Sequence, residues 1–171
     1  FGGPQYPKAP ELNFLGVQAL GLGLGTLIRE MGVAPRIVTG HDYRSYSLSI
    51  KQALTLGLIE AGFEVHDIGL ALSPVAYFAQ FALDIPCVAM VTASHNPAKY
   101  NGYKVYGADG CQITLEVAAK ILAAIEAVDC FAVQPADFDA ALAEGKIEYS
   151  SEKCLDDFVD AVYAQRVGDG A

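Results

Sequence analysis

The sequence is poor in positive charge. It contains 11 lysines and arginines against 20 aspartates and glutamates, which gives a formal net charge of −9. Binding to nucleic acid or to an anionic membrane needs a basic face, so this balance argues against both kinds of partner. Long apolar runs are also missing, since no uninterrupted stretch reaches the roughly 18 residues of a membrane helix. The N-terminus lacks the basic start of a signal peptide, and we expect a soluble, cytoplasmic protein.

Cysteine is scarce, and two common functional motifs are absent. The four cysteines have no Cys-x-x-Cys spacing, which argues against zinc and indicates buried or incidental thiols in a reducing compartment. They are Cys87, Cys111, Cys130 and Cys154. The Gly-x-Ser-x-Gly motif of many acyl-transfer enzymes does not occur. Gly21-x-Gly23-x-Gly25 neither follows a predicted strand nor has the spacing of a dinucleotide-binding loop.

Apolar periodicity predicts an alternation of helices and strands. With 171 residues, 53% of them hydrophobic, the chain can form one well-buried core and begin a second domain. The predicted helices are 14–31, 47–61, 74–83, 114–128 and one beginning at 151, and the predicted strands are 36–39, 64–68 and 85–91, followed by a turn-back through 103–106. Residues 129–146 are predicted to be a connector or a short helical turn. We therefore predict a three-layer α/β/α fold with a mostly parallel, mixed sheet of about four strands.

Capping residues define several of the predicted helix ends. Gly32 and Gly62 would end the first two helices, and Ser47 and Thr114 would cap the helices that begin beside them. The first helix contains four glycines, each of which costs it roughly 1 kcal/mol relative to alanine unless it permits close packing. They are Gly16, Gly21, Gly23 and Gly25.

A polar loop follows the buried strand 85–91. It runs from Thr92 to Gly102 with the sequence Thr-Ala-Ser-His-Asn-Pro-Ala-Lys-Tyr-Asn-Gly. Pro97 keeps the chain from continuing as a helix after the strand. We predict that Ser94, exposed at the C-terminal end of a strand, is a nucleophile, and the alternative is an ordinary polar turn.

A lysine belongs to the same segment. Asn101-Gly102 favours a tight turn that brings Lys104 back toward Ser94 and His95. A serine with a cation beside it suits phosphate chemistry. Acyl transfer is the rival chemistry, and it is disfavoured because a histidine rarely points its ring at the hydroxyl of the residue directly before it.

The segment His41-Asp42-Tyr43-Arg44 follows the first predicted strand and has two interpretations. Arg44 could hydrogen-bond a phosphate on Ser94 or the backbone of the loop. The interpretation that we favour is a structural pair of Asp42 and Arg44 that fixes the loop. His66, in the middle of a strand, is interpreted as structural, and neither histidine has a second ligand at metal-binding spacing.

Three segments of the chain carry a family resemblance. Residues 92–97, Thr-Ala-Ser-His-Asn-Pro, with 100–104, Tyr-Asn-Gly-Tyr-Lys, resemble a phosphoserine loop. Residues 37–47 resemble a strand that ends in Gly-Arg-Asp-x-Arg-x-Ser. Residues 65–70 with Ser73-Pro74 resemble Val-x-Asp-x-Gly followed by Thr-Pro. All three are similar to segments of the α-D-phosphohexomutases, the phosphomannomutase and phosphoglucomutase family.

The resemblance, which covers about residues 12–128, implies a mechanism. Ser94 would carry a phosphoryl group, donate it to a hexose 1- or 6-phosphate, and recover it from the other oxygen of a bisphosphate intermediate. His95 would orient or polarise the transferring group, and Lys104 would assist proton transfer at the sugar hydroxyl. Three further residues would support the phosphate-binding loop: Asn96, Arg44 and Asn101.

The same resemblance implies a cofactor and an activator. Mg²⁺ would bind the phosphate on Ser94, a hexose bisphosphate would activate the enzyme, and a hexose phosphate would be its substrate. The carboxylates that complete the metal site are missing here, because the family's Asp-x-Asp-x-Asp-Arg loop does not occur. The nearest acidic cluster, Asp156-Asp157 with Asp160, has the spacing of a solvated helix face.

The resemblance also implies a domain organisation. The family's enzymes have four domains, so we expect residues 1–135 to form domain I with the phosphoserine loop. Residues 136–171 would be a connector and a helix leading to a missing domain II. The family's Tyr-Asp-x-Arg-Gly segment is also absent, and position 41 is histidine where the family more often has arginine. We expect the fragment alone to be inactive, with an apolar helix stripe left exposed or paired with another copy.

Two functional alternatives remain open. Within the family, phosphomannomutase or a dual mannose/glucose enzyme is favoured over phosphoglucosamine mutase. Outside catalysis, the chain could belong to a phosphosugar-binding or regulatory paralogue that kept the fold. The presence of Ser94, His95 and Lys104 favours the enzyme.

Overall fold

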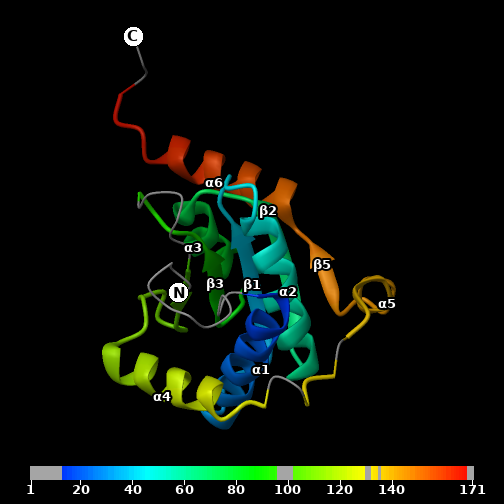
Figure 1. The fold of residues 1–171 in the computed structure, drawn as a ribbon. Helices are drawn as coiled ribbons and strands as arrows, with labels where there is room; N and C mark the ends of the chain where they lie inside the picture. The colour runs from blue at the N-terminus through cyan, green and yellow to red at the C-terminus, as the bar shows by residue number, and fades with distance from the viewer. Residues whose placement is uncertain (1–12, 96–101, 130–131, 135, 169–171) are drawn as a thin grey trace.

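The structure is a computed structural model that describes residues 13–95, 102–129, 132–134 and 136–168. Six helices and five strands follow one another along these residues, in alternation except that β4 follows β3 and α5 follows α4 (Figure 1). In chain order they are α1 (Phe14–Glu30), β1 (Arg36–His41), α2 (Ser47–Glu60), β2 (Glu64–Leu70), α3 (Ser73–Ala82), β3 (Val88–Val91), β4 (Tyr103–Tyr106), α4 (Leu115–Glu126), α5 (Phe138–Ala143), β5 (Ile147–Tyr149) and α6 (Ser151–Ala164).

The five strands form one mixed sheet in the order β4-β3-β1-β2-β5. β3, β1, β2 and β5 are parallel, and β4 pairs antiparallel with β3. The predicted fold class is therefore confirmed, including the turn-back after the polar loop. The strand count differs from the prediction, because β5 lies in a stretch that the sequence pattern assigned to a connector.

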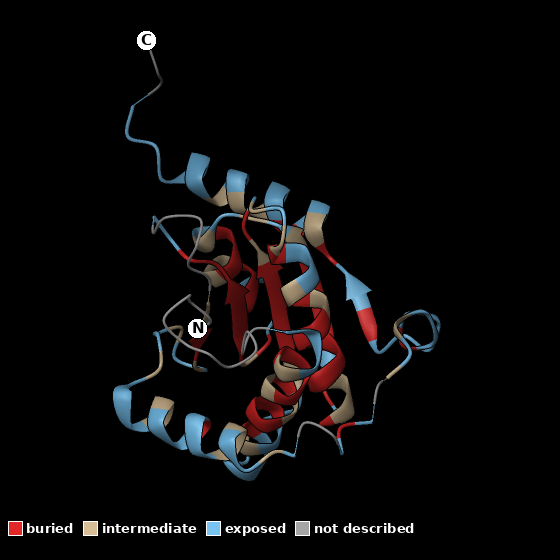
Figure 2. Cartoon of the chain, viewed as in Figure 1, coloured by how far each residue is buried: buried red, intermediate tan, exposed pale blue. Residues whose placement is uncertain are grey.

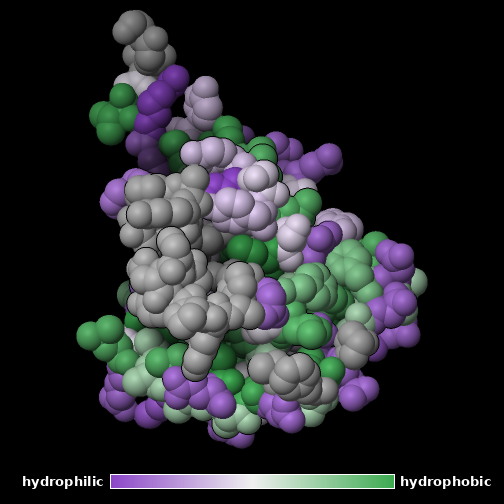
Figure 3. Space-filling view, in the orientation of Figure 1, coloured by the Kyte–Doolittle hydropathy of each residue, from purple (hydrophilic) through white to green (hydrophobic). Residues whose placement is uncertain are grey.

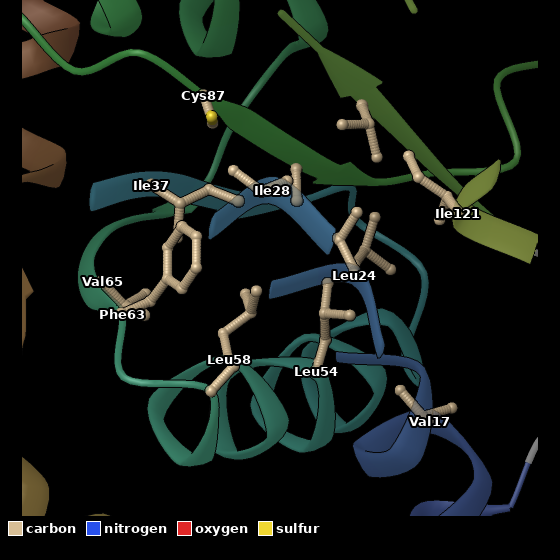
Figure 4. Close-up of a cluster of buried hydrophobic side chains, with 14 of the residues drawn as sticks. Val17, Leu24, Ile28, Ile37, Leu54, Leu58, Phe63, Val65, Cys87 and Ile121 are labelled. Atoms are coloured by element: carbon tan, nitrogen blue, oxygen red, sulfur yellow. The ribbon is translucent and has the colours of Figure 1, made fainter. Parts of the chain in front are cut away.

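Helices cover both faces of the sheet, which gives the predicted three layers. On one face, Ile37 of β1 and Val65 of β2 belong to the same buried cluster as Leu24 of α1, Leu54 of α2 and Ile121 of α4 (Figure 4). Figure 2 shows that the buried residues concentrate in the central strands and on the inner sides of α1 and α2. Each large apolar side chain buried in this way contributes about 1.5–3 kcal/mol to folding.

The other face carries a smaller core. Val38, one residue after Ile37 in β1, and Ile68, three residues after Val65 in β2, point to this side because strand side chains alternate. They form a buried cluster with Val75 of α3 and Cys154 of α6, while Phe158 packs against its edge. Because helices cover both sides, β1 is buried on both faces from Ile37 to Gly40.

Two glycines let α1 and α2 pack with their backbones in contact. A Cβ atom added to Gly21 would lie 2.3 Å from the carbonyl oxygen of Leu54, and one added to Gly57 would lie 2.0 Å from the carbonyl oxygen of Gln18. No side chain larger than hydrogen fits either position without moving a helix backbone. Gly21 and Gly57 therefore permit close packing of the two helices, which offsets their low helix propensity.

The predicted helix ends are mostly confirmed. Gly32 and Gly62 follow α1 and α2 with φ of +76° and +86°, and the Thr114 hydroxyl accepts a hydrogen bond from the Val117 N–H at the start of α4. The prediction for Ser47 is wrong. Tyr46 occupies the N-cap of α2, and the Ser47 hydroxyl instead donates a hydrogen bond to Asp42.

The segment after residue 129 contributes to the sheet as well as to a helix. β5 pairs with β2 through Ile147 opposite Val65, and the Ser150 N–H donates to the Asp67 carbonyl at the start of α6. Only Ile147 is buried in this three-residue edge strand, so its sequence carries almost no apolar pattern. The lack of an apolar pattern explains why the sequence did not predict β5.

Helix α6 packs on α3 through a narrow part of its surface. The rings of Phe158 and Phe78 meet edge to face with centroids 5.6 Å apart, and Cys154 is fully buried. The rest of the predicted apolar stripe is exposed, and hydrophobic residues show along α6 in the space-filling view (Figure 3). Its exposed members are Leu155, Val159, Val162 and Tyr163.

Among the helices that the structure describes, none combines the length and the apolar character needed to cross a membrane. The longest, α1, is also interrupted by glycines and lies against α2 and α4.

Candidate active site

The polar loops after β1 and β3 lie side by side. These two strands are parallel neighbours in the sheet, with His41 opposite Val91, so both chains leave the sheet at the same edge. The Asp42 N–H donates a 3.0 Å hydrogen bond to the Val91 carbonyl and ties the start of the two loops together. In α/β folds, ligands bind outside the carboxyl ends of the strands, which is where these loops lie.

Ser94 has an unusual backbone conformation. Its φ is +55°, and among the described residues only Asp84 shares a positive φ without being glycine. The left-handed conformation costs an ordinary residue about 1–2 kcal/mol. Ser94 is also exposed, so burial of its side chain does not repay that cost. The surrounding residues must therefore hold the backbone in place.

Hydrogen bonds on both sides of Ser94 hold this conformation. Its N–H donates to the Thr92 hydroxyl oxygen at 2.9 Å, and its carbonyl accepts from Arg44 Nη2 at 3.1 Å. Arg44 Nη1 also pairs with the Asp42 carboxylate. Both interpretations of Arg44 therefore describe part of its geometry, since it forms the pair with Asp42 and binds the loop backbone.

The carboxylate of Asp42 is the centre of this network. It accepts hydrogen bonds from the Ser47 hydroxyl at 2.6 Å, from the Arg44 N–H at 3.2 Å and from the Thr92 hydroxyl. Burial raises the pKa of Asp42, but the hydrogen bonds from Ser47, Arg44 and Thr92 outweigh it and hold the pKa below its ordinary value. The carboxylate is therefore ionised at neutral pH.

The ring of His95 points at the hydroxyl of Ser94. The Ser94 Oγ and His95 Nδ1 atoms are 3.2 Å apart, so the expectation that an adjacent histidine would turn away is wrong. Acyl transfer gains little from this contact, since no carboxylate of the described residues orients the other ring nitrogen. The contact can position the hydroxyl or exchange a proton with it.

Lys104 lies on the neighbouring antiparallel strand. It pairs with Met90 of β3, is half-buried, and forms no ion pair with a carboxylate of the described residues. Within the same residues it makes no hydrogen bond to Ser94 or His95. The strand pairing agrees with the predicted turn-back, and the role of Lys104 remains a prediction. Asn96 and Asn101 lie outside the described residues.

Two other residues at this edge were not singled out by the sequence pattern. Thr92 forms the local turn that receives the Ser94 N–H, and a threonine two residues before the predicted nucleophile is a signal for such a turn. Tyr43 is exposed, with its ring centroid 5.8 Å from the Arg44 guanidinium carbon. His41 donates from Nδ1 to the Asp42 carbonyl at 2.8 Å, which places it in the loop structure.

A buried ion pair behind this edge was also missed. Lys51 of α2 donates a 2.6 Å hydrogen bond to Asp67 of β2, and their side chains are 3% and 4% exposed. The sequence did contain a sign that Lys51 is buried. Leu54 and Leu58 follow it at spacings of three and seven residues, which places all three on the inward face of the helix. His66 is structural as interpreted, since it is buried in β2 and paired with Glu64.

The two neighbouring loops and the strands that carry them fall within a segment that matches a known protein family. The model of the phosphoglucomutase/phosphomannomutase family for its alpha/beta/alpha domain I matches residues 6–130. The chain belongs to this family. The match spans both loops of the site and ends before α5.

Relatives within the phosphoglucomutase/phosphomannomutase family have several different names. The chain is 41% identical over 107 residues to a probable phosphoglucosamine mutase of Pyrococcus furiosus, which covers 63% of this chain and 23% of that protein. It is 34% identical over 161 residues to a phosphoribomutase of Saccharomyces cerevisiae, covering 89% of this chain and 26% of that protein. The chain therefore spans about a quarter of the length of these relatives.

Solved structures of the family share the fold. A putative phosphomannomutase from Thermus thermophilus superposes with a TM-score of 0.67 at 30% identity, over 82% of this chain and 30% of that one. A phosphoglucomutase/phosphomannomutase family protein from Burkholderia thailandensis superposes with a TM-score of 0.59 at 25% identity, over 81% of this chain and 29% of that one. The likeness covers the sheet that carries the site.

Family membership generally implies dependence on Mg²⁺, an ion that binds groups of oxygen ligands. In the part of the chain that the structure describes, no three residues among histidine, cysteine, aspartate and glutamate are grouped to bind a metal. The one carboxylate in the Ser94 network, Asp42, is already bound by Arg44, Ser47 and Thr92. The described residues therefore do not make a magnesium site by themselves.

Proposed function

We propose that this chain is the phosphoserine-bearing domain of a phosphomutase that interconverts hexose 1-phosphate and hexose 6-phosphate. One observation carries the proposal: Ser94 is exposed at the end of β3 in a left-handed backbone conformation, bound on both sides, with the His95 ring at its hydroxyl. Family membership supports the same chemistry. A fixed and exposed serine oxygen is what an in-line transfer of phosphate requires.

The proposed reaction has two half-steps. The phosphoryl group on Ser94 passes to a free hydroxyl of a hexose monophosphate, so the Ser94 O–P bond breaks and a sugar O–P bond forms. The hexose bisphosphate turns over, and Ser94 recovers the phosphoryl group at the other position. Lys104 assists the movement of the sugar hydroxyl proton, and His95 positions or polarises the transferring group.

The support residues act on the loop and the phosphate. Arg44 fixes the Ser94 carbonyl, while Asn96 and Asn101 belong to the same loop sequence. Mg²⁺, where bound, supplies charge neutralisation on the phosphate of Ser94. We propose that its carboxylate ligands come from outside the described residues, which agrees with the greater length of the relatives.

The identity of the sugar is a finer proposal. The relatives' names include glucosamine, ribose and mannose phosphates, so they do not agree on one sugar. We propose a hexose phosphate, with mannose and glucose phosphates ahead of glucosamine phosphate. The enzyme would act in the cytoplasm, and a hexose bisphosphate would restore phosphate to Ser94 when it is lost.

We further propose that residues 1–135 belong to the domain that carries the site, and that residues 136–171, whose β5 completes the sheet of that domain, lead on to a following domain. The exposed apolar residues of α6 support this proposal, because such a stripe is normally covered by a partner. The 171-residue chain alone would then have negligible mutase activity, because it lacks the groups that orient the sugar.

An activity assay tests the proposed function. The protein as it is made in cells would be incubated with Mg²⁺, a hexose bisphosphate and each of the 1-phosphates of mannose, glucose, glucosamine and ribose. We expect conversion to the other monophosphate isomer, and we expect Ser94→Ala to lower kcat by at least about 10³-fold because the phosphate carrier is lost.

The matched control for this assay is Thr26→Ala, which removes an exposed hydroxyl from the C-terminal half of α1, the helix that leads into the opposite end of β1. It should retain the wild-type kcat. A folded protein that converts none of the four sugars, but binds them, would instead support the non-catalytic paralogue.

A further inference from the structure

We propose that Asp42 is a positioning residue that sets the backbone conformation of Ser94 through Thr92 and Arg44. The catalytic consequence rests on the proposed function of Ser94, whereas the structural claim does not. Asp42 lies 52 positions before Ser94 in the sequence and on a different strand loop. Its effect on Ser94 therefore depends on the pairing of β1 with β3.

The two groups that bind the Ser94 backbone are both held by Asp42. Thr92 receives the Ser94 N–H at 2.9 Å, and Arg44 donates to the Ser94 carbonyl at 3.1 Å. Thr92 and Arg44 are in turn hydrogen-bonded to the carboxylate of Asp42. One carboxylate thus anchors the hydrogen bonds on both sides of the residue with φ of +55°.

The hydrogen-bonding capacity of the Thr92 hydroxyl determines which of its two neighbours it donates to and which it accepts from. A hydroxyl has one hydrogen to donate and two lone pairs to accept with. Because an ionised carboxylate only accepts, the hydrogen of Thr92 must point at Asp42, and a lone pair is then left to face the Ser94 N–H. Without the carboxylate, the Thr92 hydrogen would lose this acceptor and the hydroxyl would be free to rotate away from the Ser94 N–H.

Asp42 is itself held firmly enough to act as an anchor. Its carboxylate accepts from the Ser47 hydroxyl in the first turn of α2, and its own N–H is bonded to the Val91 carbonyl. The residue is 9% exposed, so water competes little for these bonds. A series of hydrogen bonds therefore connects α2 and β3, through Asp42, to the backbone of Ser94.

The test uses Thr92, where a matched pair of substitutions is available. Thr92→Val keeps the shape of the side chain and removes the hydroxyl, whereas Thr92→Ser keeps the hydroxyl. The protein would be labelled with ¹³C- and ¹⁵N-serine, and the Ser94 signals assigned by their loss in Ser94→Ala. The Cα shift, the coupling between the amide and α protons, and the amide exchange rate then report the conformation of Ser94.

We expect Thr92→Ser to keep the wild-type Ser94 signals. Thr92→Val should move the Cα shift and the coupling away from left-handed values, and the Ser94 amide should exchange about tenfold faster because its acceptor is gone. Asp42→Asn should have the same effect on Ser94, although it changes neither Thr92 nor Arg44, the two residues that bind the Ser94 backbone. Asp109→Asn, which changes a carboxylate that also accepts a turn N–H, from Cys111, is the control and should change nothing at Ser94.

Activity measurements separate this proposal from the proposed function. If the protein is a mutase, Thr92→Val should lower kcat about tenfold with little change in KM, and Thr92→Ser should restore it. An inactive wild-type protein whose Ser94 signals still respond to Thr92→Val and Asp42→Asn would contradict the function and support the positioning. A folded Asp42→Asn protein with wild-type Ser94 signals would overturn the positioning of Ser94 by Asp42, whether or not Thr92→Val changes those signals.

Discussion

Asp42 illustrates how a single charge can organise two loops. Its carboxylate accepts hydrogen bonds from Ser47, Arg44 and Thr92, which belong to α2, to its own loop and to the loop after β3. Hydrogen bonds to a charged group are worth about 1.5–3 kcal/mol, more than those between neutral groups. Neutralising this one group should therefore weaken several contacts at once.

The lowered pKa of Asp42 predicts a pH dependence of stability. A carboxyl group with a lower pKa in the folded state stabilises the fold fully above its unfolded pKa of about 3.9, and that contribution is lost as pH falls through the folded pKa. We expect the free energy of unfolding of the wild type to fall more steeply between about pH 5 and pH 2 than that of Asp42→Asn. Urea unfolding across this range measures it.

The control for the pH experiment is Asp109→Asn, which removes an exposed carboxyl group outside the Ser94 network. It should keep the acid dependence of the wild type. If Asp42→Asn and the wild type lose stability in parallel as pH falls, Asp42 does not contribute the expected stabilisation.

At the scale of single residues, the sequence predicted which segments form the site but not how they connect. The pair of Asp42 with Arg44 and the exposed Ser94 follow from residues close in sequence. The bond between Thr92 and Asp42 does not, because it exists only after β1 and β3 have paired. The direction of the His95 ring depends on a backbone φ that the residue types alone do not specify.

Among the helices and strands, the crossing of α1 over α2 shows how glycine can favour a helix pair. The two helices make the most extensive contact between any two elements of the described chain, and Gly21 and Gly57 lie at its closest point. Each glycine weakens its own helix by roughly 1 kcal/mol. The gain is a close approach that buries the inner faces of both helices against the sheet.

Gly57→Ala should therefore destabilise the protein although alanine is the better helix former. The new Cβ would lie 2.0 Å from the Gln18 carbonyl oxygen, so the helices must separate. We expect the free energy of unfolding to fall by about 1–3 kcal/mol, as for other overpacked cores. Thermal or urea unfolding measures the change.

Gly23→Ala provides the graded comparison for this prediction. Its Cβ would lie 2.9 Å from the Ile125 Cα, a less severe overlap with the peripheral helix α4. We expect a smaller loss than for Gly57→Ala. An increase in stability on Gly57→Ala would show that the helices do not depend on this contact.

The strands differ in how well they could be predicted. β1, β2 and β3 each contain four consecutive buried residues, and the sequence located each of these strands. β5 has a single buried residue, Ile147, and its place beside β2 depends on tertiary pairing that no local pattern records. The buried pair of Lys51 and Asp67 is similar, because two charges become acceptable in a core only when they meet.

The charge of the whole molecule bears on how it could attract a phosphorylated sugar. The net charge is −9, and the charge of Arg44 is already balanced by Asp42. Lys104 is different, since no carboxylate of the described residues pairs with it. We therefore expect the local attraction for phosphate to come from Lys104 and from cations outside the described residues.

The central claim is that Ser94 carries a phosphoryl group, and intact-mass measurement tests it most directly. The protein purified from cells would be weighed before and after incubation with a hexose bisphosphate, beside Ser94→Ala treated in the same way. We expect the mass of one phosphate on the wild type, located on Ser94 by peptide fragmentation, and none on Ser94→Ala. A folded wild-type protein that gains no phosphate, or a phosphate that remains on Ser94→Ala, would contradict the claim.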